Sequence, residues 1–173
     1  IVIVDADLLQ IANQRIVRSS LPFTYQEPSE KLSFLRKNWN LDAVVAPGTT
    51  EMEKYILLRQ DRAGKPQKLG AMISAGWAAC AIHDALFLKT FGYVPGAPYP
   101  DLNSNLEVFT NQQMLELETL GPLVTLEPGA AVEHVEGWHL FRNVPRPTGD
   151  ADVDAYILPL ARRALAQDAA ANL

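Results

Sequence analysis

Cysteine is almost absent from the sequence, since Cys80 is its single example among 173 residues. One cysteine excludes an internal disulfide and cannot form a thiolate metal site by itself. We interpret Cys80 as a small buried hydrophobic side chain, with a nucleophilic role as the alternative. Histidine is scarce too, and His134 and His139 would fall on opposite faces of a regular strand. We therefore expect no metal site.

Concentrated positive charge and long apolar runs are also missing. The net charge is −5 at pH 7 and no basic cluster stands out, which excludes a nucleic-acid partner. No apolar run approaches the ~18–20 residues of a membrane span, so we expect no membrane partner. No secretory signal is visible, which favours a cytoplasmic over a secreted location. Because the sequence begins at Ile1 without a methionine, we expect N-terminal residues, and any signal, to be missing from it.

Recognisable cofactor motifs are lacking as well. The sequence has no glycine-rich phosphate loop, no nucleotide fingerprint and no Ser-His-Asp order. The stretch from Gly92 to Gly96 is rich in proline and precedes no predicted helix. We therefore expect neither a metal nor another cofactor.

What is present is the composition of one globular domain, with 48% hydrophobic and 20% charged residues. Short runs of strand-forming residues are separated by turn residues, and the last two of them are predicted to form a hairpin. The predicted strands are 1–4, 55–59, 68–74, 77–83, 86–91, 106–110, 114–120, 124–126 and 132–141. Strands at this spacing, joined by turns, predict a mostly β domain with an antiparallel β-sandwich.

Two segments differ from this strand pattern. Residues 18–54 carry several prolines and are predicted to be loop-rich, either as a functional loop or as a segment that wraps an edge of the sheet. Residues 150–173 are predicted to be a C-terminal helical tail, with an aspartate at its start and arginines near its end. Pro159 interrupts that pattern and predicts a bent helix or two short ones. We therefore divide the chain into a β-sandwich, 1–149, and a helical tail, 150–173.

The strand 114–119 carries the most suggestive chemistry. Alternation places Glu116 and Glu118 on one face with Met114, and two leucines on the other. The two carboxylates would lie about 6.5–7 Å apart along the strand. On a partly covered face, repulsion and loss of water would raise one pKa and give a usable general base. The alternative is a solvated face on which the pair has no function.

Neighbouring strands add further candidates. Glu107 shares a face with Phe109, and Lys89 shares a face with two phenylalanines. A lysine in such surroundings predicts a polar site within reach of its ammonium; the alternative is an edge-strand lysine that opposes aggregation. If the strands align, Lys89, Glu107, Glu116 and Glu118 face one shallow cleft.

One histidine and three aromatic residues complete the set of candidates. His83 stands at a strand end, where it would be a proton donor or an ordinary turn residue. Trp77, Tyr99 and Trp138 are candidates for stacking on a sugar ring. Trp138, however, alternates with Leu140, which favours a place in the core.

Several of these motifs together resemble one known family. The segments LEVFTN (106–111), LELETLGPL (115–123), LEPG (126–129) and EHVEGW (133–138) are similar to the C-terminal part of galactose-mutarotase-like, or aldose-1-epimerase-like, proteins. The likeness is closest to an uncharacterised bacterial branch, described only as a domain of unknown function. GWAA (76–79), FLK (87–89) and YPD (99–101) fit that branch too, and the likeness covers roughly residues 54–141.

The resemblance implies a supersandwich, or part of one, whose concave face holds a small-molecule sugar. It implies that Glu118 is the catalytic base that removes the proton from the anomeric hydroxyl, although Leu120 replaces the glutamine of the family segment. Beside Glu118, we predict substrate-binding roles for Lys89, Glu107, Glu116, His83 and Asp101.

The implied function is the interconversion of sugar anomers by general acid/base catalysis. The alternatives are a non-catalytic carbohydrate-binding or accessory β-sandwich, and a purely structural or interaction domain. An exposed edge strand in a partial sandwich would also favour a homodimer.

Overall fold

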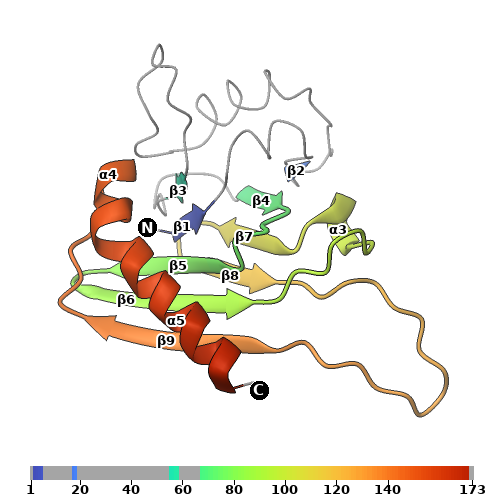
Figure 1. Ribbon diagram of the computed structural model, residues 1–173. Coiled ribbons are helices and arrows are strands. Elements are labelled where there is room, and N and C mark those ends of the chain that lie inside the picture. The colour runs from blue at the N-terminus through green and yellow to red at the C-terminus, as the bar shows by residue number, and fades with distance from the viewer. Residues whose placement is uncertain (1, 6–16, 19–54, 59–66, 172–173) are drawn as a thin grey trace.

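The computed structural model describes residues 2–5, 17–18, 55–58 and 67–171. Within these ranges the chain forms strands, with the short helix α3 Pro100–Asn103 between β6 and β7, and ends in one helical segment (Figure 1). The strands are β1 Val2–Asp5, β2 Val17–Arg18, β3 Tyr55–Leu58, β4 Gln67–Ala71, β5 Trp77–Ile82, β6 Ala85–Phe91, β7 Leu106–Thr110, β8 Leu115–Thr119 and β9 Glu136–Arg142.

These strands form two antiparallel sheets. One sheet has five strands in the order β3-β1-β5-β6-β9, and the other has four in the order β2-β4-β7-β8. The prediction of a mostly β, antiparallel fold is therefore confirmed, and β7 has the predicted bounds. The loop-rich interpretation of 18–54 lies outside the described residues, apart from Arg18 in β2.

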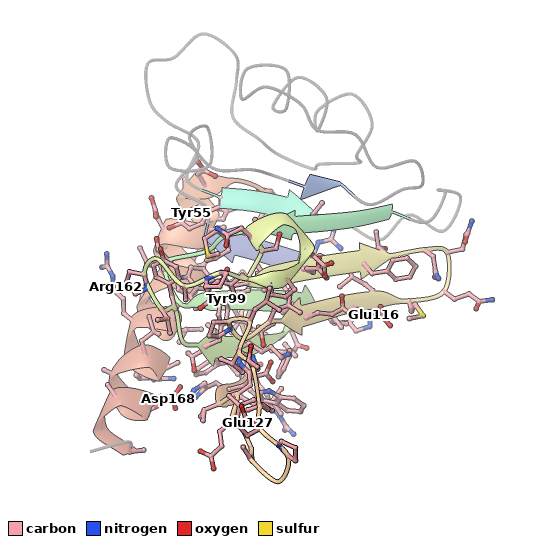
Figure 2. The ribbon with its side chains drawn as sticks, turned by 90° about the vertical axis from the view of Figure 1, so that its right-hand side faces the viewer. Tyr55, Tyr99, Glu116, Glu127, Arg162 and Asp168 are labelled. Atoms are coloured by element: carbon pink, nitrogen blue, oxygen red, sulfur yellow. The ribbon has the colours of Figure 1, made fainter. Side chains whose placement is uncertain are left out.

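The predicted hairpin of 124–126 with 132–141 is wrong. Residues 120–135 contain no strand, and β9 begins at Glu136 and pairs with β6 instead. The predicted turn at 127–130 is present: the backbone N–H of Ala130 donates a hydrogen bond to the backbone oxygen of Glu127 at 2.9 Å. Leu126 and Val132 beside it are exposed, and a two-stranded ribbon with no covered face is marginal in water. The segment instead projects from the sheets as a long loop, with Glu127 far along it (Figure 2).

The predicted interruption of the C-terminal helix is present as a widened turn. The helical segment consists of α4 Asp150–Asp152, the π-helical turn η1 Val153–Ile157 and α5 Leu158–Ala171. In η1 the N–H of Leu158 bonds to the oxygen of Val153, five residues back. Pro159 follows at once; it has no N–H, and its ring would clash with the carbonyl of a regular helical turn. The π turn accommodates the proline without ending the helical segment.

The helical segment covers one face of the five-stranded sheet. Figure 1 shows α5 lying across β6 and β9. Between them lies one buried core, in which alanines on both helix and sheet allow close approach. Its members are Tyr55, Leu57, Trp77, Ala79, Ala81, Leu86, Leu88, Val144, Val153, Ile157, Ala161 and Ala164. The predicted tail is thus packed into the core of the domain.

Asp168 ties the last turns of α5 to the sheet. Its Oδ2 accepts a hydrogen bond from the Thr90 hydroxyl on β6 and lies 2.9 Å from His139 Nε2 on β9. These two hydrogen bonds lower the pKa of Asp168 below its ordinary value. The carboxylate lies over Gly137, where an added Cβ would come 2.8 Å from Asp168 Cγ. Figure 2 shows Asp168 on the side of α5 that faces the strands, and Arg162 on the opposite side.

The substitution Ile157→Ala tests whether the helical segment is part of the core. Ile157 is fully buried against the sheet, so its truncation should lower the free energy of unfolding by about 2–5 kcal/mol. The neighbouring Tyr156 is exposed, and Tyr156→Ala is the matched control, expected within about 0.5 kcal/mol of the wild type. Urea denaturation measures both, and equal effects would show that the helix does not cover this core.

Candidate functional site

The side chain of Lys89 on β6 reaches a polar cluster between the two sheets. Lys89 is buried, at 7% exposure. Its Nζ lies 2.9 Å from Glu136 Oε1 on β9 and donates to the backbone oxygen of Leu117 on β8 at 3.1 Å. Because β6 lies between β5 and β9, the alternative interpretation of Lys89 as an edge-strand residue is wrong. The ammonium lies among polar groups, as we predicted for a lysine that shares its strand face with phenylalanines.

Glu136, at the start of β9, is the centre of this cluster. Its Oε1 accepts from Lys89 and from the Thr119 hydroxyl of β8, and its Oε2 accepts from Trp138 Nε1 at 2.7 Å. His134 Nε2 lies 2.9 Å from Thr119 Oγ1 and 4.0 Å from Glu136 Oε1. We call these five residues, Lys89, Thr119, His134, Glu136 and Trp138, the Glu136 cluster.

The surroundings of Glu136 hold its carboxyl group in the charged form. Burial by itself raises the pKa, because it removes water from the carboxylate. Hydrogen bonds from Lys89, Thr119 and Trp138, together with the positive charge of Lys89, outweigh burial and lower the pKa from 4.5 to about 2. Such a carboxylate is a weak base near neutral pH. Glu136 therefore acts as a hydrogen-bond acceptor that fixes its neighbours.

Trp138 presents its ring to solvent, which overturns the prediction that it belongs to the core. Trp138 is 68% exposed and Leu140 is 80% exposed. Alternation does place both on one face of β9, but α5 covers the other face, where Phe141 and His139 lie. The indole is nevertheless held in place. Its N–H bonds to Glu136, Phe87 meets it edge-on at 5.5 Å between ring centroids, and Lys89 Nζ lies 5.6 Å from its centroid.

The other two aromatic candidates for stacking are buried. Trp77 is 1% exposed and packs in the core with its ring centroid 6.3 Å from that of Tyr55. Tyr99 is 5% exposed, stacks with Tyr93 and accepts a hydrogen bond from the N–H of Val94 at 3.0 Å. Of the tryptophans that the structure describes, only Trp138 can offer a ring face to a ligand.

The three predicted glutamates share one face of the four-stranded sheet. In the register of β7 with β8, Glu107 lies opposite Glu118, and Phe109 lies opposite Glu116. Thr119 projects from the other face of β8, since neighbouring strand residues alternate, and it is Thr119 that contacts Glu136.

The structure therefore does not bring Lys89 together with Glu107, Glu116 and Glu118 in one cleft. Figure 2 shows Glu116 on β8, far from α5. The reason for the difference lies in the packing of the sheets, because the Thr119 face of β8 is the one that meets β6 and β9. Alternation along one strand shows which residues share a face, but it does not show which of the two faces meets the other sheet.

His83 and Asp101 also lie outside the Glu136 cluster. His83 lies in the turn that joins β5 to β6, with a φ of 55°. This position agrees with the alternative that His83 is an ordinary turn residue. It stands six residues before Lys89 along an extended strand, a separation of about 20 Å. Asp101 belongs to the short helix α3, Pro100–Asn103, where its side chain is exposed and its backbone oxygen accepts from Ser104 Oγ at 3.0 Å.

Four members of the Glu136 cluster were not among the predicted site residues: Thr119, His134, Glu136 and Trp138. A signal for Glu136 and His134 was present in the segment 133–138, where an acidic residue, a histidine and a tryptophan occur within six positions. The two histidines near this segment have separate partners, since His134 bonds to Thr119 while His139 bonds to Asp168 under the helix. In the part of the chain that the structure describes, no three His, Cys, Asp or Glu residues are grouped so that they could hold a metal ion.

No family model, curated protein or solved structure matches this chain. Among the residues with described positions, no helix combines the length and the apolar character needed to cross a membrane. What the site can do therefore follows from its own geometry. It offers an exposed, immobilised indole beside a hydroxyl, an imidazole and a carboxylate.

The substitution Glu136→Gln tests the electrostatics of this cluster. It removes the charge that faces Lys89 and should lower the free energy of unfolding at pH 7 by about 1–3 kcal/mol. Because the folded-state pKa is depressed to about 2 from 4.5, the contribution of Glu136 is fully present above pH 4.5 and is lost as the pH falls toward 2. The difference between variant and wild type should therefore shrink in that window.

Denaturation at several pH values makes this measurement, with Glu133→Gln as the control. Glu133 is an exposed glutamate three residues before Glu136, so its substitution should have little effect at any pH. A difference for Glu136→Gln that stays constant from pH 7 to pH 2 would contradict the assignment.

Proposed function

We propose that this domain binds a carbohydrate without transforming it, on the indole of Trp138 and the polar groups around it. The observation that carries the proposal is an indole that is 68% exposed and yet held by Glu136, Phe87 and Lys89. A large aromatic ring kept in water on a sheet face forgoes most of the free energy that its burial would contribute to the fold. Its rigidity lowers the entropy that a ligand would have to remove on binding.

The chemistry of a sugar ring fits this surface. One face of a pyranose presents C–H groups, which carry partial positive charge, and the face of an aromatic ring is negative. The hydroxyl groups around the pyranose both donate and accept hydrogen bonds. The Thr119 hydrogen is already donated to Glu136, so the oxygens of Thr119 and Glu136 can accept from the sugar, and His134 Nδ1 can accept or donate according to the tautomer. The ring and its polar rim thus supply the two kinds of contact that a neutral sugar needs.

The geometry supports binding better than the aldose-epimerase reaction. That reaction needs a general base and a general acid at one sugar. Glu136 is a weak base, because its pKa is about 2. Glu118 lies on the face of β8 opposite to Thr119, and Thr119 is the β8 side chain that contacts Glu136. Neither Glu136 nor Glu118 therefore combines a position beside the Trp138 ring with the basicity that the reaction requires.

We further propose that the two sheets pack as an antiparallel β-sandwich of the galactose-mutarotase-like kind. Two interactions that link the sheets support this. Lys89 of the five-stranded sheet bonds to the Leu117 oxygen, and Glu136 accepts from Thr119 in the four-stranded sheet. Leu106 and Val108, which lie opposite Thr119 and Leu117 in the register of β7 with β8, are apolar and buried, which fits an inner face, although Glu107 on the other face is buried too.

A sugar titration of Trp138 variants tests the binding proposal. The indole N–H resonance or the intrinsic fluorescence of Trp138 should change on addition of a bound mono- or disaccharide. Trp138→Ala should weaken binding at least about tenfold, equivalent to about 1.4 kcal/mol. Trp138→Phe should weaken it less, because it keeps a ring but loses the bond to Glu136.

Tyr156→Ala is the control, because it removes an exposed aromatic ring from the helical segment, and calorimetry compares the variants. If no sugar in a broad panel binds, the proposal fails and a structural role remains. If a sugar binds with equal affinity to the wild type and to Trp138→Ala, the site lies elsewhere.

An anomerisation assay separates binding from catalysis. Polarimetry on freshly dissolved aldoses should show the uncatalysed rate in the presence of the protein, and Glu118→Gln should leave that rate unchanged. An acceleration that Glu118→Gln abolishes would contradict the non-catalytic proposal and support the epimerase activity that the family resemblance implies. The sugar that binds in the titration is the first substrate to assay.

A further inference from the structure

β9 forms an edge of the five-stranded sheet within the described part of the chain. It pairs with β6 on one side only, from Glu136 to Arg142. Edge strands of natural proteins commonly carry a lysine, a proline or a bulge that prevents pairing with a second chain. The sequence of β9, EGWHLFR, contains neither lysine nor proline and pairs with β6 in an unbroken register. This edge is therefore open to a further strand.

The sequence of β9 is complementary to itself in the antiparallel direction. If a two-fold axis passes beside His139, Glu136 of one copy lies opposite Arg142 of the other, and Trp138 lies opposite Leu140. The first pair joins opposite charges, with the Glu136 carboxylate also bonded to Lys89, Thr119 and Trp138 of its own chain. The second joins the two most exposed large hydrophobic side chains of the strand. Opposite charges and apolar side chains are the cross-strand pairs that stabilise antiparallel sheets. Each pair occurs twice because of the symmetry.

The Gly137–Phe141 pair and the neighbouring registers favour the same alignment. In the His139-centred register Gly137 lies opposite Phe141, so the smallest residue faces one of the largest, and His139 lies opposite its own copy. A register centred on Trp138 places Glu136 opposite Leu140. A register centred on Leu140 places Trp138 opposite Arg142. Both of these alternatives separate the two charges.

We propose that two copies of this chain associate through β9, antiparallel and centred on His139, so that their five-stranded sheets become one. The partner of this edge is thus a second copy of the chain. The pairing takes place in the plane of the sheet and leaves the face of the Trp138 ring open. It brings two such rings onto one continuous surface. The proposal does not depend on sugar binding.

Sedimentation equilibrium of edge variants tests the association. Leu140→Lys places a charge opposite Trp138, and Arg142→Glu places like charges opposite each other, twice in each dimer. Each should raise the dimer dissociation constant at least about tenfold. Leu140→Lys replaces an apolar cross-strand contact with a charge, and Arg142→Glu places like charges directly opposite, which destabilises a pair. Val94→Lys is the control, since it adds the same charge at an exposed apolar residue outside β9, and it should leave the constant unchanged.

Disulfide trapping tests the register. In a Cys80→Ala background, the double variant Trp138→Cys, Leu140→Cys should cross-link on mild oxidation, with peptide mapping showing bonds between positions 138 and 140 of different chains. Opposite residues of an antiparallel pair have Cα atoms about 4.5–5.5 Å apart, within the range of a disulfide. Each single cysteine variant should stay unlinked, because neither position faces itself.

Two sets of results would overturn the proposal. One is a wild-type chain that sediments as a monomer at every loading concentration, or a dimer that neither edge substitution weakens. The other is efficient linkage of a single cysteine variant, which would place the axis elsewhere. Leu140→Lys should retain the sugar affinity of the wild type, so failure of the dimer and failure of the sugar site are distinguishable.

Discussion

The ion pair of Lys89 with Glu136 is the interaction on which the arrangement of the two sheets depends. A lysine removed from water costs several kcal/mol unless its charge and its hydrogen-bond donors are matched. Here the carboxylate supplies the charge at 2.9 Å, and a backbone oxygen of the other sheet accepts from the same ammonium. Three strands, β6, β8 and β9, must therefore meet in one geometry for Lys89 to be buried, and the position of Trp138 follows from that geometry.

Much of the fold could be predicted from local pattern. Runs of strand-forming residues and the turns between them located most of the strands, and Pro159 correctly indicated the irregular helical turn. The hairpin after β8 was wrong because pairing depends on what covers a strand, and Leu126 and Val132 are covered by nothing among the described residues. β9 pairs instead with β6, whose nearer end lies 45 residues earlier along the chain. The local sequence around β9 does not indicate so distant a partner.

The site was less predictable than the fold for the same reason. Alternation correctly grouped Glu107, Glu116 and Glu118 on one face, yet it could not tell which face of β8 meets the other sheet. Lys89 was a sound candidate because a lysine among phenylalanines requires a polar partner. Its partner, Glu136, lies 47 residues away in sequence. Trp138 was assigned to the core because apolar alternation cannot distinguish a covered face from an open one.

The helical segment that covers the five-stranded sheet follows every described strand in the chain. During synthesis at about 5–20 residues per second, the strands leave the ribosome before the segment that buries their apolar face. For that interval Trp77, Leu86 and Leu88 have no α5 to pack against. Until α5 is made, the nascent domain has an exposed apolar sheet face. It leaves that state when Ile157 and Ala161 dock and Asp168 reaches Thr90.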